Sequence, residues 1–198
     1  MKYLVAHGCP VKRNPFVQVE CPEGVYSPAE DTMLLLGEMA VAPGQRILEV
    51  GTGSGFLALH CALAGAKVVA TDVAPSAIRC TRANAIASKA ELDLALCSFA
   101  TAIRGRYDLV IFNPPYLPGE SGLKSVDGGK GGIEPASKLL EDLGRLLNDG
   151  GKLLMVLSSL SNTERLIKLF VEFTFSPVRR KRYFFEELVV YEVRATKK

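Results

Sequence analysis

Short apolar runs of the length of buried strands alternate along this chain with segments whose apolar residues recur at helical spacing. Because helical patterns fill most of the intervals, the chain returns to the same edge of a sheet before the next strand begins. This order predicts an α/β fold with a mostly parallel sheet and helices on both faces. The predicted parallel strands cover residues 46–50, 67–71, 92–96, 107–112 and 152–157.

Five helices are expected beside these strands, and the first two carry end signals. Ser27 fits the N-cap of the first helix, with Pro28 at its first position and Glu30 completing a capping box. Gly65 fits the C-cap of the second helix. The expected helices cover 27–41, 56–64, 75–88, an apolar series at 139–147 that stops at 150–151, and 162–172.

Two further strand-like segments, 178–183 and 188–193, close the sequence with only a few residues between them. A connection this short joins antiparallel neighbours, so we expect a C-terminal antiparallel hairpin. With 198 residues and 48% hydrophobic composition, the chain suffices for one substantial core. We therefore expect a single domain over 1–198, with an irregular N-terminal segment at 1–24.

Composition argues against several classes of protein. A net charge of +3 falls well short of the basic field of a dedicated nucleic-acid-binding protein. The five cysteines are widely spaced and form no C-x-x-C pair, so we expect neither a disulfide framework nor a metal site. The longest apolar runs are about five residues, far below the roughly 20 that span a membrane, and residues 1–3 do not open a signal peptide. A soluble, cytoplasmic protein is the simplest expectation.

The run Asn113-Pro114-Pro115-Tyr116 directly follows the strand 107–112, at the edge where an α/β sheet presents its chemistry. Two prolines fix φ and remove two N–H donors, so this turn is stiff and presents acceptors. A nitrogen about to take a methyl group has two N–H donors, which the Asn113 side-chain oxygen and the Pro114 carbonyl can accept. Tyr116 can stack on its planar group. The run therefore indicates methylation of a planar nitrogen, with a rigid turn without chemistry as the alternative.

A glycine loop at 49–55 lies between the first strand and its helix, where backbone N–H groups can approach a ligand closely. A dinucleotide fingerprint needs glycine where this chain has Phe56, and the Lys-Ser/Thr pair of a P-loop is missing. Asp72 ends the second strand, where a carboxylate can accept both hydroxyls of a ribose, and Glu49 faces the same crevice. Two carboxylates repel phosphates and favour a cationic ligand, so S-adenosylmethionine is the expected cofactor; solvated strand ends are the alternative.

Together these segments resemble the HemK/PrmC-type glutamine methyltransferases, and most closely the archaeal and eukaryotic branch that modifies class-1 translation release factors. The resemblance implies a seven-stranded, Rossmann-like class I methyltransferase sheet. It also implies methyl transfer from S-adenosylmethionine to the glutamine amide of a Gly-Gly-Gln loop. The resemblance rests on residues 25–32, 49–55, Asp72, 112–116, 158–161 and 184–188.

The resemblance assigns roles on both sides of the expected crevice. Asn113, Pro114 and Pro115 would position the substrate amide, and Tyr116 would flank it. Ser98 stands where such enzymes often carry an acid for the adenine amino group, and a neutral serine is the weaker partner. The implied cofactor contacts are Tyr26, which would close over the site, Thr32, Glu49, Gly51, Gly53, Asp72, Val73, Ser98, Phe99 and Asn113.

The strand 92–96 is expected at an edge of the sheet, where unpaired backbone groups invite a partner. In the resembling branch that partner is a small zinc-binding activator protein, so the resemblance implies a heterodimer in which the activator pairs with this edge. The other implied partner is a class-1 translation release factor as substrate. Neither a membrane nor a nucleic acid is expected as a partner.

Three other functions stay open at this point. An Asn-Pro-Pro-Tyr run can also hold the adenine amino group of DNA or RNA, although 198 residues leave little room for a target-recognition region. Methylation of a lysine is the second alternative. A non-catalytic module that keeps the cofactor fold is the third.

The remaining features are interpreted as structural. We expect the basic run 179–182 on a solvated strand, Tyr183, Phe184 and Phe185 in core and strand packing, and His60 in an ordinary packed environment. The glycine-rich stretch 118–132 follows the Asn113 run. It fits a mobile lid over a peptide substrate and a plain flexible loop equally well.

Overall fold

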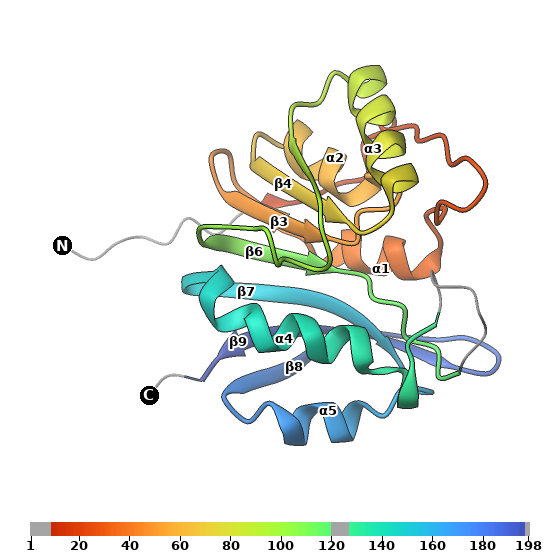
Figure 1. The fold of residues 1–198 in the computed structure, drawn as a ribbon, viewed down its shortest axis with the longest axis vertical. Coiled ribbons are helices and arrows are strands. Elements are labelled where there is room, and N and C mark those ends of the chain that lie inside the picture. Colours follow the sequence, from red (N-terminus) through yellow and green to blue (C-terminus); the bar gives the residue numbers. More distant parts are fainter. Residues whose placement is uncertain (1–8, 120–126, 197–198) are drawn as a thin grey trace.

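Seven strands form the central sheet of the protein, for which the computed structural model describes residues 9–119 and 127–196. The strands are β3 (Arg46–Val50), β4 (Lys67–Asp72), β5 (Asp93–Leu96), β6 (Tyr107–Phe112), β7 (Leu147–Ser158), β8 (Phe173–Arg182) and β9 (Glu187–Ala195). Across the sheet their order is β5-β4-β3-β6-β7-β9-β8 (Figure 1). Strands β3 to β7 are parallel, and β9 runs antiparallel to both neighbours. The seven-stranded, mostly parallel sheet and the C-terminal antiparallel hairpin are therefore confirmed.

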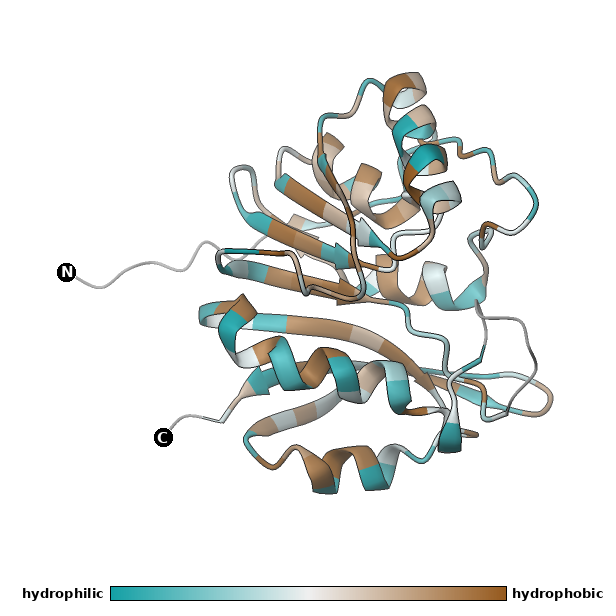
Figure 2. Cartoon of the chain, in the orientation of Figure 1, coloured by the Kyte–Doolittle hydropathy of each residue, from teal (hydrophilic) through white to brown (hydrophobic). Residues whose placement is uncertain are grey.

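Helices cover both faces of this sheet (Figure 1). One face carries α1 (Glu30–Glu38), α2 (Phe56–Leu63) and α3 (Pro75–Ser88), and the other carries α4 (Glu134–Leu146) and α5 (Thr163–Leu169). In the central strand β3, Ile47 packs with the first group and Leu48 with the second, because successive side chains of a strand point to opposite faces. Figure 2 shows mostly hydrophobic strands lying between helices that carry both hydrophobic and hydrophilic residues.

The helix α4 shows how the helical pattern becomes a core. Leu139, Leu140, Leu143 and Leu146 are each at most 1% exposed and lie at the spacing that places them on one helix face. Burial of each contributes about 1.5–3 kcal/mol. The predicted continuation of this helix to residue 147 is wrong, because Leu147 begins β7 and pairs with β6.

The first helix begins later than its end signals predict. α1 starts at Glu30, so Ser27 and Pro28 precede it, and its N-cap is Ala29. The N–H of Ala29 donates to Thr32 Oγ1 at 3.4 Å. Thr32, rather than Glu30, is therefore the side chain that returns to the N-cap.

The same helix also ends earlier than predicted, at Glu38. The chain leaves it because β2 (Ala40–Val41) pairs antiparallel with β1 (Cys9–Pro10). The described part of the N-terminal segment, predicted to be irregular, thus contributes one short strand. Its other residues up to 24 lie in neither helix nor strand.

The strand β5 lies at one edge of the sheet, as predicted, and among the described residues it pairs only with β4. The chain continues from β5 to β6 through turns at 97–106 rather than through a helix. Leu96, at the end of β5, is 56% exposed.

None of the helices in the described ranges is long and apolar enough to cross a membrane.

The strand β8 forms the opposite edge and carries the basic run 179–182, whose side chains are all exposed. Arg180 forms a 2.9 Å ion pair with Glu187, and Arg179 lies 3.8 Å from Glu38. Exposed pairs of this kind contribute little to stability. The prediction of a solvated basic strand is confirmed.

The turn between β8 and β9 corrects one prediction. Tyr183 packs against the core as expected, whereas Phe184 and Phe185 are 95% and 86% exposed. Core packing of these two rings is therefore wrong, because they lie in the turn, beyond the last paired residues of the hairpin.

The ring of His60 is buried on α2, and its predicted packed environment is confirmed. His60 Nε2 accepts from the Asn14 N–H at 3.0 Å, so Nδ1 carries the proton and donates to the Phe56 carbonyl at 2.8 Å. Burial lowers the pKa of His60 and keeps the ring neutral.

Candidate active site

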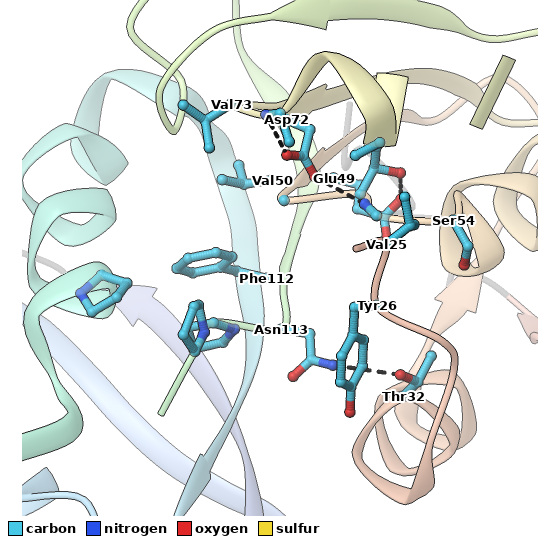
Figure 3. A pocket seen from close by; sticks show the side chains of 18 of the residues that line it. Val25, Tyr26, Thr32, Glu49, Val50, Ser54, Asp72, Val73, Phe112 and Asn113 are labelled. Atoms are coloured by element: carbon cyan, nitrogen blue, oxygen red, sulfur yellow. Dashed lines mark hydrogen bonds between the residues drawn. The ribbon is translucent and has the colours of Figure 1, made fainter. Parts of the chain in front are cut away.

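A cavity of about 440 Å³ opens at the carboxyl ends of β3, β4 and β6 (Figure 3). In a parallel sheet this is the edge where the loops after successive strands converge. Its wall holds every residue that the sequence assigned to the site, drawn from five stretches of the chain, and the role of each residue remains a prediction. These residues are Tyr26, Thr32, Glu49, Gly51, Gly53, Asp72, Val73, Ser98, Phe99, Asn113, Pro114, Pro115 and Tyr116.

The loop 51–55 turns the chain from β3 into α2 through glycines at positive φ. Gly55 has a φ of 82° and packs against α3, where an added Cβ would lie 2.6 Å from Thr81 Cγ2. The N–H of Gly53 donates to Asp72 Oδ2 at 3.0 Å. Because side chains are missing here, the loop approaches both α3 and the cavity closely.

Glu49, near the end of β3, is 4% exposed. Its Oε2 accepts from Thr52 Oγ1 at 2.6 Å and from the Ala58 N–H at 3.1 Å. Burial raises the pKa of Glu49 to about 8; the charge of Asp72 adds to the rise and the two hydrogen bonds oppose it. The carboxyl group is therefore mostly protonated at neutral pH, until a positive charge enters the cavity.

Asp72, at the end of β4, already uses both carboxylate oxygens in the protein. Oδ2 accepts from the Gly53 N–H at 3.0 Å and Oδ1 from the Ala74 N–H at 2.9 Å. A carboxylate has about four lone-pair positions, so each oxygen keeps one for a ligand. The neighbouring Val73 is 70% exposed and adds an apolar part to the wall. This combination suits a ligand with hydroxyl groups beside a flat apolar ring.

The turn after β5 supplies the facing wall. Phe99 has a φ of 50° and meets Phe112 edge to face, with 6.2 Å between ring centroids. Its carbonyl accepts from Thr71 Oγ1 at 2.8 Å, which helps to hold this left-handed conformation. Ser98 is exposed at the cavity wall. The wall thus presents an aromatic ring beside a neutral hydroxyl.

Residues 113–116, which we call the Asn113 turn, extend from the end of β6 along the cavity wall. Asn113 Nδ2 donates to Thr32 Oγ1 at 3.4 Å (Figure 3). Asn113 Oδ1 is buried and has no hydrogen-bond partner in the part of the chain that the structure describes. Leaving a buried acceptor unsatisfied costs about 1–3 kcal/mol. The cavity wall therefore keeps an acceptor for a donor that comes from outside the protein.

Asp31 is a site residue that the sequence interpretation missed. Its Oδ2 accepts from Tyr26 OH at 2.9 Å and from Tyr116 OH at 3.2 Å, and its Oδ1 accepts from Thr32 Oγ1 at 3.1 Å. Burial, together with the charge of Asp31, raises the pKa of both tyrosines, so both hydroxyls remain donors. Asp31 is part of the stretch 25–32 that supports the resemblance, but only the contact with Tyr116 reveals its place in the site.

The described part of the glycine-rich stretch packs against the Asn113 turn. A Cβ at Gly132 would clash with the carbonyl of Tyr116. Ser161 Oγ donates to the same carbonyl at 2.7 Å. Asp127 lines the cavity from this side, while residues 120–126 of the predicted lid lie outside the described residues.

The donor set of the cavity suits an organic ligand. No group of three or more His, Cys, Asp or Glu side chains that could hold a metal ion occurs within 9–119 and 127–196. The carboxylates of Glu49 and Asp72 are oriented by backbone N–H groups. Apolar walls, two oriented carboxyl groups and an amide oxygen that no described residue binds together describe a pocket for a charged, partly aromatic molecule.

Comparison with known proteins places this site in context. The methyltransferase small domain family matches residues 17–185. A Methanocaldococcus jannaschii protein assigned as a protein N5-glutamine methyltransferase is 32% identical over 176 residues, 84% of this chain and 89% of that protein. The release factor glutamine methyltransferase of Deinococcus radiodurans is 32% identical over 137 residues, 63% of this chain and 49% of the relative.

Among solved structures, one similar chain comes from the E. cuniculi Mtq2–Trm112 complex, which is responsible for methylation of the eRF1 translation termination factor. The TM-score is 0.69 at 18% identity, over 87% of this chain and 99% of that chain. At this level of identity the likeness concerns the fold.

Substitution of Gly55 by alanine tests the close approach of the loop to α3. Gly44 is a matched control, because its φ is also 82° and an added Cβ would have nothing within 4 Å. Both substitutions carry left-handed strain of about 1 kcal/mol, and only Gly55→Ala adds overpacking worth roughly 1–3 kcal/mol. Urea denaturation should show the larger loss in the free energy of unfolding for Gly55→Ala. Equal losses would mean that the loop relaxes away from Thr81.

The Glu49→Gln variant tests the raised pKa. Between pH 4.5, the ordinary pKa, and about 8, native Glu49 keeps a proton that the unfolded chain releases. The free energy of unfolding of the wild type therefore falls as pH rises through this window. Glutamine reproduces both hydrogen bonds with one oxygen and does not titrate, so the variant should gain relative stability, by at most about 1.4 kcal/mol per pH unit. Denaturation at pH 5 and pH 8 checks this, and a constant difference between the proteins contradicts it.

Proposed function

Because the chain belongs to the methyltransferase small domain family and, within it, to the HemK/PrmC-type N5-glutamine methyltransferases, we propose that it is an S-adenosylmethionine-dependent protein-glutamine N-methyltransferase. The acceptor is the side-chain amide nitrogen of the glutamine in the Gly-Gly-Gln motif of a translation release factor. The names of the archaeal and bacterial relatives support the reaction and the substrate. The family match over 17–185 supports one methyltransferase domain spanning the chain.

The observation that carries this proposal is the buried Oδ1 of Asn113 on the cavity wall, which has no hydrogen-bond partner among the described residues. A glutamine side chain ends in a planar amide with two N–H donors, and Asn113 Oδ1 accepts one of them. The carbonyl of Pro114, held in a stiff turn by two consecutive prolines, accepts the other. Two fixed acceptors orient the nitrogen for in-line attack and stabilise the positive charge that develops on it.

The residues around the cavity fit the proposed cofactor. The glycine loop lets the backbone come close, and Asp72 keeps lone pairs for the ribose hydroxyls. Val73 and Phe99 offer apolar surface to the adenine ring. Asp72 provides negative charge for a cationic ligand, and Glu49 adds to it when the ligand's positive charge favours loss of its proton. When bound, S-adenosylmethionine supplies an activated methyl group on a sulfonium sulfur, which is left as a neutral thioether.

The two tyrosines shape the position of the acceptor amide. Asp31 holds the hydroxyls of Tyr26 and Tyr116 on one oxygen, so neither ring is free to turn away. We assign Tyr116 to the flat face of the substrate amide and Tyr26 to the cover of the site. Rings held in this way exclude water from the reacting nitrogen.

We further propose that a small zinc-binding activator protein pairs with β5 to give a heterodimer. In the described sheet β5 has a neighbour on one side only, so its other side offers unpaired backbone groups. Leu96 adds exposed apolar surface at its end. The assembly of the structural neighbour Mtq2 with Trm112 supports a protein partner.

The Asn113→Ala variant tests the proposed reaction. It removes the free acceptor, so methyl transfer should fall by roughly 10²–10³-fold, while S-adenosylmethionine binding measured by calorimetry is largely kept. Asn148→Ala is the control, because Asn148 bonds Asp108 away from the cavity wall. A wild-type rate for Asn113→Ala would overturn the role of Asn113.

The choice of methyl acceptors in this assay distinguishes the possible substrate classes. Label from S-adenosylmethionine should reach a release factor, and it should be lost when the glutamine of Gly-Gly-Gln is replaced. Label on adenine-containing oligonucleotides instead would overturn protein methylation. Cofactor binding without label on any acceptor would indicate a non-catalytic binding module.

The Leu96→Asp variant tests the β5 edge. Leu169 on α5 provides the matched control, since it is also 56% exposed and lies at the far side of the sheet. A charge at Leu96 should weaken capture of the co-expressed activator by about tenfold or more, whereas Leu169→Asp should not. Equal capture by both variants would place the partner elsewhere.

A further inference from the structure

Three exposed apolar side chains lie in two adjoining turns, one after β7 and one between β8 and β9. Phe184 and Phe185 are 95% and 86% exposed, and Leu160, in the turn after β7, is 51% exposed. The two phenyl rings lean on each other edge to face, with 5.1 Å between centroids. We call these three residues the rim platform. Exposed apolar clusters of this kind mark interaction sites more often than scattered single residues do.

The rim platform is built on well-connected turns. Ser158 Oγ donates to Glu186 Oε2 at 2.7 Å and accepts from the Leu160 N–H at 3.1 Å. The Glu187 N–H donates to Ser159 Oγ at 3.0 Å. The turn that carries Leu160 and the turn that carries the phenyl rings are thereby joined into one unit.

The same unit is continuous with the candidate active site. Ser161, next to Leu160, donates to the carbonyl of Tyr116 at 2.7 Å. The charge of Glu186 contributes to the raised pKa of Tyr26 and of Tyr116, so Glu186 lies within electrostatic reach of both. Figure 1 shows the β8–β9 turn at the end of the sheet toward which β6 and β7 run. The rim platform and the cavity therefore lie at the same end of the sheet.

The chemistry of the proposed substrate requires a surface of this kind. A Gly-Gly-Gln motif offers one side chain, and that side chain enters the cavity, while the two glycines have none to be recognised. Affinity for a particular protein must then come from contacts outside the motif. Aromatic residues, phenylalanine among them, are enriched at protein–protein interfaces relative to the rest of the surface.

Basic and acidic side chains, among them Arg182 and Glu186, are mixed beside the rim platform, and this mixture favours a protein over a nucleic acid as occupant. Arg180 is engaged with Glu187, and Lys181 lies over the ring of Tyr183 at 5.0 Å. Glu186 places an acid directly next to Phe185. The phenyl rings face each other edge to face rather than offering open parallel faces to bases.

We propose that Leu160, Phe184 and Phe185 form a docking surface for the folded protein substrate, outside the pocket that takes its glutamine. This inference rests on the proposed function and deepens it, because it names where the substrate protein is recognised. Two separate surfaces then determine the affinity for the substrate protein, one that binds the reacting amide and one that binds the body of the protein.

The test uses a double variant, Phe184→Ser with Phe185→Ser, co-expressed with the activator. Binding of the release factor is measured by calorimetry, and methyl transfer is measured on the release factor and on a short Gly-Gly-Gln peptide. Binding of the release factor should weaken and its KM should rise by about tenfold or more. The kcat at saturation, the rate on the peptide and cofactor binding should be unchanged. Val171→Ser is the control, since Val171 is 77% exposed at the turn before β8.

The outcomes separate the inference from the proposed function. Equal binding of the release factor by the double variant and the wild type would overturn the docking surface alone. Release factor that binds without being methylated by the wild type would overturn the proposed function alone, and absence of binding to the wild type would overturn both. Loss of the activator from the double variant, or a change in its oligomeric state, would assign the rim platform to another occupant and overturn the inference.

Discussion

The parallel pairing of β3 with β4 on one side and with β6 on the other is the constraint on which the rest of the structure depends. In this register Val50 lies beside both Thr71 and Phe112. The next residues along the three strands are therefore Gly51, Asp72 and Asn113, spaced by about 4.8 Å from strand to strand. A glycine loop, a carboxylate and an amide come together because three strands end at one level.

Much of this arrangement could be predicted from the sequence, because the fold rests on local patterns. Strand-length apolar runs and helical spacing are properties of neighbouring residues, and they predicted the sheet and its closing hairpin. The errors lie where a distant segment competes for a residue. Leu147 was predicted in the helix, but it pairs with β6 instead. Residues 40–41 were predicted in the first helix, but they pair with β1. Spacing within a segment contains no information about such a competitor.

The candidate site likewise contains residues that local patterns predict and residues whose place depends on distant contacts. Residues at the carboxyl ends of strands, such as Asp72 and Asn113, could be assigned because the ends of neighbouring parallel strands meet at one edge of the sheet. The place of Asp31 could not, since it depends on Tyr116, which is remote in sequence. Phe184 and Phe185 were misassigned because apolar character predicts burial only where backbone pairing turns the side chain inward. In a turn, the same character leaves an aromatic ring in solvent.

The free oxygen of Asn113 also determines what the pocket rejects. Glutamate has nearly the shape of glutamine but presents oxygens where glutamine presents N–H groups, so acceptor would meet acceptor at Asn113 Oδ1. Its negative charge would also approach the carboxylate of Asp31, which is already buried behind the tyrosines. The side chain of a substrate protein that has lost its amide by hydrolysis is therefore excluded from the pocket by repulsion.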